Sequence, residues 1–223
     1  MTNKALIKEF FESVQGEGPY VGYNQLFIRF SKCNLDCQFC DTDFISELNE
    51  YSPQELADIV NKRANIHSVS LTGGEPLLEI DFLKEFLPLV NKKIFLETNG
   101  TLYKNLEKVI DKIDIVSMDI KLPSTSGNQD LFEVHKCFID VAKKANKEIY
   151  LKVVFDENTT DEEISICTNL AKENDILLVL QPKMDGEVLN LKADIIHSTF
   201  YKFAEKYHNV RLIPQVHKFL NLL

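Results

Sequence analysis

The chain has 223 residues, 44% of them apolar, and carries a formal net charge of −9 at neutral pH. This length and apolar content fit one domain of the larger kind, which we expect to span residues 1–223. The acidic balance argues against a protein that coats nucleic acid or an anionic membrane, because phosphate binding needs clustered Lys and Arg. No stretch approaches the ~18 consecutive apolar residues of a membrane span, and the chain does not begin with the apolar run of a signal peptide. We therefore expect a soluble, cytoplasmic protein.

Strands are predicted to alternate with helices along the chain. In chain order, the apolar patterning predicts strand 4–13, strand 24–30, helix 52–63, strand 67–71, helix 81–90, strand 94–97, helix 102–111, strand 115–119, loop 123–127, helix 129–146, strand 149–155, helix 161–174, strand 176–181, helix 192–207 and strand 210–214. This alternation is typical of a parallel sheet with right-handed crossovers. About six β/α units fit in the chain, fewer than the eight of a full barrel. We therefore predict an α/β fold, an incomplete TIM-like barrel of about six parallel strands with reduced helices.

Three of the five cysteines lie close together, since only three residues separate Cys33 from Cys37 and only two separate Cys37 from Cys40. This clustering is typical of metal ligands in a reducing compartment and not of a disulfide framework. A structural zinc site normally has four ligands, and no further Cys or His follows closely. A cubane iron–sulfur cluster with three protein thiolates leaves one iron open for an outside ligand. A zinc knuckle completed by a distant residue, or unrelated cysteines in a loop, are the alternatives.

Polar clusters follow several of the predicted strands, where functional residues gather in sheets of this kind. They are the cysteine loop (31–44), Thr72–Glu75, Glu97–Gly100, Asp119–Lys121 and Gln181–Met184. Paired glycines let a backbone approach a ligand closely, and their carbonyls together with Glu75 suit a cationic amino group. A plain tight turn is the alternative for Gly73-Gly74-Glu75-Pro76 alone. For Glu97, a contact to backbone and a contact to substrate both stay open.

The cysteine triplet combined with Gly73-Gly74-Glu75-Pro76 resembles radical S-adenosylmethionine enzymes. Gln15-Gly16-Glu17-Gly18, Arg29, Cys40–Asp43 and the ending Pro214–Lys218 further resemble the 7-carboxy-7-deazaguanine synthase family, from about residue 9 to the chain end. The resemblance implies a lyase of queuosine and other 7-deazapurine biosynthesis, and so of a tRNA modification pathway. Such an enzyme converts 6-carboxy-5,6,7,8-tetrahydropterin to 7-carboxy-7-deazaguanine with loss of ammonia.

The resemblance also implies a set of site residues. Cys33, Cys37 and Cys40 would bind a [4Fe–4S] cluster whose open iron is chelated by S-adenosylmethionine, and Thr42 would contact Mg²⁺. The substrate would be held by Val14, Gln15, Gly16, Glu17, Arg29, Thr72, His217 and the carboxylate of Leu223. The S-adenosylmethionine site would be lined by Gly73, Gly74, Glu75, Asp119, Ile120, Lys121, Gln181, Pro182, Lys183 and Met184. No side chain is expected to be catalytic beyond the cofactor-bound radical, and the tail 210–223 is expected to close over the substrate.

The same resemblance suggests a homodimer, a flavodoxin or ferredoxin as electron donor, and no nucleic-acid or membrane partner. One stretch departs from the family, since Ser117–Lys121 replaces the Ser-Pro-Lys that the family often has on its fourth strand and is similar to glycyl-radical activating enzymes. Such an activator is the first alternative, although it gives no reason for Gln15, Arg29 or the Pro-Gln-x-His ending. A non-catalytic metal-cluster-binding regulator is the second. Cys137 and Cys167 fall at helical positions and are expected to be inert thiols.

Overall fold

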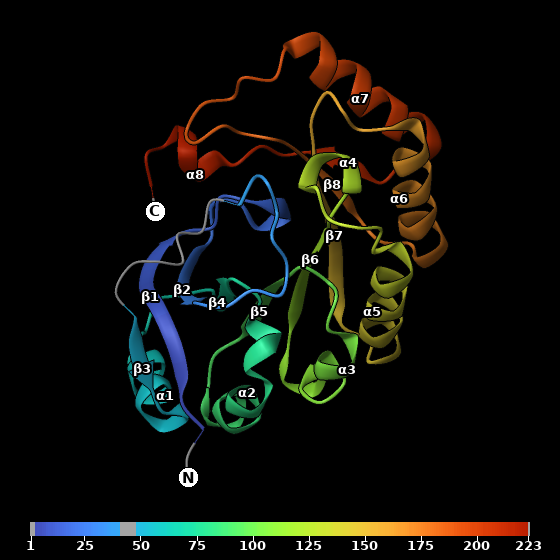
Figure 1. Cartoon of the computed structure of the whole chain (residues 1–223). Helices are drawn as coiled ribbons and strands as arrows, with labels where there is room; N and C mark the ends of the chain where they lie inside the picture. The colour runs from blue at the N-terminus through green and yellow to red at the C-terminus, as the bar shows by residue number, and fades with distance from the viewer. Residues whose placement is uncertain (1–2, 41–47, 223) are drawn as a thin grey trace.

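The computed structural model describes residues 3–40 and 48–222. In this part of the chain the strands form one sheet of nine, in the order β3-β1-β2-β4-β5-β6-β7-β8-β9. The two end strands, β3 (Asn49–Tyr51) and β9 (Val210–Leu212), do not pair with each other, so the sheet curves without closing. Figure 1 shows the strands arranged in an arc with the larger helices outside it. The predicted incomplete α/β barrel is confirmed.

The parallel part of the sheet starts at β2 and contains seven of the described strands, one more than the about six expected. Its members are β2 (Asn24–Phe30), β4 (Ser68–Gly73), β5 (Ile94–Thr98), β6 (Ile115–Ile120), β7 (Glu148–Phe155), β8 (Leu178–Pro182) and β9. Strand β1 (Ala5–Val14) runs antiparallel to β2, and the short β3, which was not predicted, pairs antiparallel with β1. These two antiparallel strands therefore extend the parallel sheet at one edge.

The helices are α1 (Pro53–Asn61), α2 (Ile80–Phe86), α3 (Tyr103–Leu106), α4 (Pro123–Ser126), α5 (Phe132–Lys144), α6 (Asp161–Asn174), α7 (Ala193–Lys206) and α8 (Val216–Phe219). Helix α1 begins as predicted, because Ser52 accepts from the N–H of Glu55 while the Glu55 carboxylate accepts from that of Ser52. Among the described residues, no helix is long and apolar enough to cross a membrane.

Two local predictions were wrong. The helix expected over 102–111 is only the short α3 followed by a 3-10 turn at Ile110–Lys112, because Val109 leaves the helical path at φ −131°. This break lets the neighbouring Val109 and Ile110 both enter the core. The loop expected over 123–127 contains α4, which starts at Pro123 and ends at Gly127 in the left-handed conformation.

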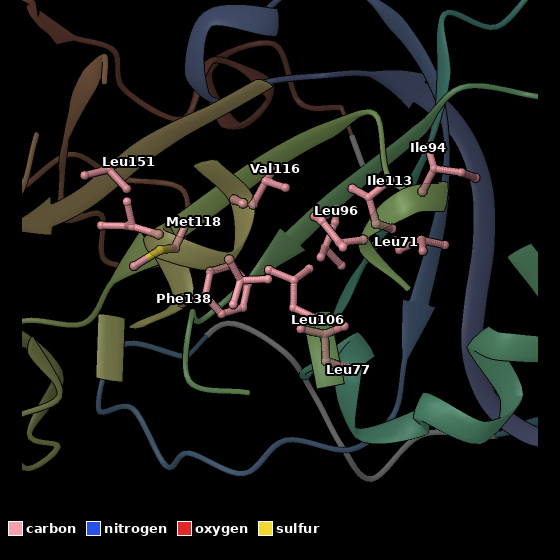
Figure 2. Packing of buried hydrophobic residues seen from close by; sticks show 14 of the residues in the cluster. Leu71, Leu77, Ile94, Leu96, Leu106, Ile113, Val116, Met118, Phe138 and Leu151 are labelled. Atoms are coloured by element: carbon pink, nitrogen blue, oxygen red, sulfur yellow. The ribbon is translucent and has the colours of Figure 1, made fainter. Parts of the chain in front are cut away.

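Successive side chains of each strand point to opposite faces of the sheet. The outer face is apolar: Leu71, Leu96, Met118 and Leu151 are fully buried in one cluster with Phe138 of α5, as Figure 2 shows. The inner face is mixed. Its lower part is an apolar floor of Phe95, Ile115, Tyr150 and Val179, and its upper part, at the carboxyl ends of the strands, is polar.

Candidate active site

A cavity of about 950 Å³ opens at the carboxyl ends of the parallel strands. Many of the predicted site residues line it: Val14, Gln15, Gly16, Glu17, Arg29, Cys33, Cys37, Cys40, Gly73, Gly74, Asp119, Lys121, Gln181, Lys183, Met184 and His217. Thr72, Glu75, Ile120 and Pro182 do not line it, although all four lie next to residues that do. Thr42 and Leu223 fall outside the described residues. The fold thus brings most of the predicted residues to one place.

The three clustered cysteines lie in the loop that leaves β2. Cys33 and Cys37 are half-buried and Cys40 is exposed, and the N–H of Cys40 donates to the carbonyl of Cys37 at 3.0 Å. Among the described residues, three N–H donors face the sulfurs: the Leu35 amide reaches Cys33 Sγ at 3.5 Å, the Asn99 side chain reaches the same sulfur at 3.9 Å, and the Asn128 side chain reaches Cys37 Sγ at 3.1 Å. Burial raises the pKa of the Cys37 thiol, and Lys121 and Asn128 oppose that rise. Hydrogen-bond donors aimed at sulfur suit thiolate ligands.

A mononuclear metal site does not fit this geometry. In residues 3–40 and 48–222, no three Cys, His, Asp or Glu side chains are placed to share one metal ion. A cubane cluster is different, because each thiolate binds its own iron atom and the sulfurs need not converge on a point. Three cysteines on one loop, facing a cavity large enough for a second ligand, therefore fit an iron–sulfur cluster better than zinc.

The glycine pair joins the end of β4 to the cysteine loop. Gly74 donates to the carbonyl of Phe30 and the next residue, Glu75, donates to that of Lys32, at 3.0 and 2.7 Å. A side chain at position 74 would place its Cβ 2.0 Å from the Lys32 carbonyl oxygen, so only glycine fits. The paired glycines therefore fix the start of the cysteine loop against the sheet.

The Glu75 side chain is held by hydrogen bonds from within the protein. Its carboxylate is fully buried and accepts from the backbone N–H groups of Leu77 and Asn99 and from the Thr98 hydroxyl, at 2.8–3.1 Å. Burial raises its pKa to about 7, against the opposing effect of these donors. Glu75 thus ties the ends of β4 and β5 together, and it does not line the cavity, whereas Gly73 and Gly74 do.

Glu97 accepts hydrogen bonds from several side chains of the polar inner face. Its carboxylate accepts from Gln15 Nε2 at 2.9 Å, from the Ser70 hydroxyl at 3.0 Å and from the Thr72 hydroxyl at 2.7 Å. Gln15 Nε2 also donates to Gln25 Oε1 at 2.9 Å, and Gln15 Oε1 accepts from the Glu17 N–H at 3.0 Å. Glu97 itself lines the cavity, as its partner Gln15 does, and these three hydrogen bonds all come from side chains and not from the backbone.

Four charged side chains alternate in sign across the inner face. Lys152 of β7 forms ion pairs with Glu17 and, at 3.3 Å, with Asp119, which also pairs with Lys121 at 3.0 Å. Burial would lower the pKa of Lys152, but Asp119 and Glu17 outweigh it and hold this pKa well above the usual range. Burial would likewise raise the pKa of Glu17, but Lys152 keeps it below its ordinary value. Lys152 and Glu17 therefore stay charged at neutral pH.

The C-terminal segment crosses the mouth of the cavity and docks on the turn after β1. Gln215 Nε2 donates to Glu17 Oε1 at 2.7 Å, and the N–H of Val216 donates to the Gly16 carbonyl at 2.9 Å. A Cβ at position 16 would lie 2.2 Å from His217 Nδ1, so glycine is required for this approach. Figure 1 shows α8 above β1 and β2, two strands that are far from it in the sequence. The two ends of the chain thus complete one wall of the site.

Arg29 differs from two residues predicted to line the S-adenosylmethionine site, Asp119 and Gln181, in whether protein groups satisfy its polar atoms. Arg29 Nε donates to Glu9 at 2.8 Å and its guanidinium lies 5.8 Å from the Phe11 ring centre, at the rim of the cavity. Among residues 3–40 and 48–222, Asp119 Oδ1 and Gln181 Oε1 are buried acceptors without a hydrogen-bond partner. Buried acceptors of this kind are normally satisfied, so their position beside the cavity indicates a ligand that carries N–H or O–H donors.

Several site residues were missed from the sequence: Gln25, Ser70, Asn128, Lys152 and Gln215. Lys152 could have been found, since it is the one charged residue in the otherwise apolar strand 149–155. Gln215 belongs to the recognised ending but was not assigned a contact. Asn128 carried no signal, because its position depends on the fold of the loop after α4.

The comparisons with known proteins agree with this geometry. Residues 27–166 match the family model of the radical SAM superfamily. A 7-carboxy-7-deazaguanine synthase of Geobacter sulfurreducens is 38% identical, and the match covers 98% of both chains. One of Thermoplasma acidophilum is 36% identical, with 96% of each chain covered.

Solved structures show the same fold at lower identity. The crystal structure of QueE from Escherichia coli matches with a TM-score of 0.67 at 20% identity, covering 96% of this chain and 95% of that one. Native anSMEcpe with bound AdoMet matches with a TM-score of 0.60 at 21% identity, over 86% of this chain and 60% of that one. With the full-length relatives and the superfamily match together, the chain belongs to the radical SAM superfamily and, within it, to the 7-carboxy-7-deazaguanine synthase family.

Proposed function

We propose that this chain is a radical S-adenosylmethionine lyase that converts 6-carboxy-5,6,7,8-tetrahydropterin to 7-carboxy-7-deazaguanine with loss of ammonia, in queuosine and 7-deazapurine biosynthesis. The observation that carries the proposal is one cavity lined by both the cysteine loop and the polar inner face. Near-full-length relatives named for this activity support it. The cavity of about 950 Å³ falls within the range of small-molecule sites.

Cys33, Cys37 and Cys40 would hold a [4Fe–4S] cluster, and S-adenosylmethionine would occupy the side of the cavity next to it. When bound, the reduced cluster and S-adenosylmethionine supply one-electron cleavage of the sulfonium and hydrogen abstraction at C6 of the pterin. The backbone of Gly73 and Gly74 would meet the amino group of methionine, and the unpartnered acceptors Asp119 Oδ1 and Gln181 Oε1 would accept from donors of the bound ligands. Lys121, Lys183 and Met184 complete this side.

The substrate would lie over Glu97 on the other side of the cavity. Gln15 is held by Glu97, Gln25 and the Glu17 N–H, so the amide presents a fixed face to a ligand. The guanidinium of Arg29 suits the two oxygens of the pterin carboxylate. Thr72, whose hydroxyl donates to Glu97, would act through that carboxylate. The docked segment of Gln215 and His217 would exclude water from the reacting carbon.

Three finer features belong to the same proposal. Mg²⁺ would bind the substrate with help from Thr42, because a hydroxyl is a hard oxygen ligand of the kind Mg²⁺ accepts. The carboxylate of Leu223 would accept from the amino and ring N–H groups of the pterin. The protein would act as a homodimer that covers the edge strands, with a flavodoxin or ferredoxin supplying electrons.

The test is anaerobic turnover of the reconstituted protein with dithionite, S-adenosylmethionine, Mg²⁺ and 6-carboxytetrahydropterin, read by mass. We expect 7-carboxy-7-deazaguanine with little net loss of S-adenosylmethionine, and no product from the matched variant Cys37→Ala, while Cys137→Ala stays active. Release of 5′-deoxyadenosine without the deazaguanine would favour an activator of a protein substrate. Neither product from protein with full iron content would contradict the proposal.

A further inference from the structure

The loop after α4 is fastened to the cysteine loop. The backbone N–H of Gln38 donates to the Ser126 carbonyl at 2.9 Å. The Ser126 hydroxyl donates to the Leu122 carbonyl at 2.7 Å and accepts from the N–H of Asn128 at 3.2 Å. The backbone of Asn128 is therefore held relative to the cysteines through Ser126, by contacts that do not involve the Asn128 side chain.

From this position the Asn128 side chain reaches one cysteine sulfur. Its Nδ2 lies 3.1 Å from Cys37 Sγ, the shortest contact to a cysteine sulfur in the described part of the chain. Asn99 lies farther away, at 3.9 Å from Cys33 Sγ, and its amide also donates to Asn34 at 3.0 Å. Among these donors, Asn128 is thus the side chain best placed to act on a cysteine ligand.

A sulfur bound to iron carries no proton, so only the N–H side of the amide can face it favourably. Reduction of an iron–sulfur cluster adds negative charge to the cluster and its thiolates. A donor aimed at a ligand sulfur stabilises that charge, and hydrogen bonds to sulfur are among the features that set cluster potentials.

We propose that Asn128 is a positioning residue for the iron–sulfur cluster. Its side-chain amide donates to the Cys37 thiolate and thereby raises the reduction potential of the cluster. The inference rests on the proposed function, which assigns the cluster to Cys33, Cys37 and Cys40. It adds a residue from the loop after α4, which lies outside the motifs recognised in the sequence.

The test is a potentiometric titration of the reconstituted protein without S-adenosylmethionine, followed by electron paramagnetic resonance. Asn128→Leu removes the donor at similar volume, and Asn174→Leu is the matched control, because the Asn174 amide donates to Leu170 within α6. We expect Asn128→Leu to be about tenfold harder to reduce, which is about 59 mV for a one-electron couple. The control is expected to match the parent chain. An unchanged midpoint potential at full iron content would overturn the proposal.

A second measurement decides the case if Asn128→Leu binds too little iron to titrate. The parent chain, grown with ¹⁵N-asparagine, is expected to show a ¹⁵N coupling to the reduced cluster in pulsed resonance spectra. Asn128→Gln keeps a donor but not the label, so the coupling from Asn128 should disappear, while any coupling from the more distant Asn99 should remain. Absence of a coupling in the parent chain would overturn the role of Asn128 alone, whereas a parent chain that assembles no cluster would overturn the proposed function as well.

Discussion

The two faces of the sheet are built by the same strands but have different roles: the outer face packs apolar side chains, and the inner face carries polar ones. In β4, Val69 and Leu71 point outward into the apolar cluster, whereas Ser68, Ser70 and Thr72 point inward. Outward side chains gain stability through burial, at roughly 25 cal/mol per Å² of apolar surface. Inward polar groups gain it only when each finds a partner. The contrast teaches that outer-face changes should alter stability alone, while inner-face changes should alter ligand binding as well.

Removing a cluster ligand should have the largest effect on activity. We expect Cys37→Ala to abolish turnover and most of the iron-dependent visible absorbance, because three thiolates are the minimum that the proposed cluster requires. Stability of the cluster-free protein should change little, since Cys37 is only half-buried. Iron analysis and turnover check this outcome, and retained iron would contradict it.

Breaking the charge network on the inner face, formed by Glu17, Asp119, Lys121 and Lys152, should be the most destabilising change on that face. Lys152→Met leaves Glu17 and Asp119 as buried carboxylates without their shared partner, which should cost about 3–5 kcal/mol of unfolding free energy. Urea denaturation at neutral pH measures the loss. Adding Glu17→Gln to this variant should recover part of it. A double variant no more stable than the single one would show that charge pairing is not the cause.

Truncating a buried side chain on the outer face should lower the free energy of unfolding by a similar amount, and so provides the comparison with Lys152→Met. Phe138 of α5 is fully buried, so Phe138→Ala should lower the free energy of unfolding by about 3–5 kcal/mol. The protein that remains folded should keep its kcat and KM. If kcat of Phe138→Ala falls even at a low temperature at which the variant is folded, this would contradict the prediction that changes on the outer face alter stability alone.

His135 gives the outer half of the molecule a pH dependence. Burial lowers its pKa to about 4, against the opposing effect of its hydrogen bond with the Asn99 carbonyl. Between this value and the ordinary pKa near 6.5, the unfolded chain binds the proton and the folded chain does not. Stability is therefore fully present above about pH 6.5 and falls as the pH drops toward 4, by about 3 kcal/mol.

The matched variant for this prediction is His135→Gln, because its amide can still donate to the Asn99 carbonyl. Denaturation of parent and variant across this pH range should show the parent losing stability relative to the variant. Parallel curves would show that His135 does not titrate as described.

The smallest effect is expected at the docked C-terminal segment. Gln215→Leu removes the hydrogen bond to Glu17 and should raise the KM for the pterin about fivefold, in keeping with a net hydrogen bond of about 1 kcal/mol. The free energy of unfolding should change less than in Lys152→Met. Steady-state kinetics check the effect, and an unchanged KM would place the segment outside the substrate site.

Much of the fold could be predicted because apolar patterning determines which segments are strands and helices. Strand β2 and helix α6 matched their predicted bounds, since each carries a clear pattern of its own. Strand β3 and helix α4 were not predicted, because a three-residue strand and a single helical turn depend on contacts made elsewhere in the fold.

The candidate site was predicted where short motifs carry the chemistry, as at Cys33, Gly74 and Gln15. It was missed where isolated residues act, because only the folded chain brings Asn128 to Cys37 and Ser70 to Glu97. Glu75 shows the reverse case: its motif was recognised, but burial turns its carboxylate toward backbone donors.

An anaerobic crystal structure of the reconstituted protein with S-adenosylmethionine and 6-carboxytetrahydropterin would test the division between the faces most directly. We predict a four-iron cluster on Cys33, Cys37 and Cys40, with both ligands inside the cavity and the pterin over Glu97. A single metal ion on these cysteines, or ligands bound away from the inner face, would contradict it.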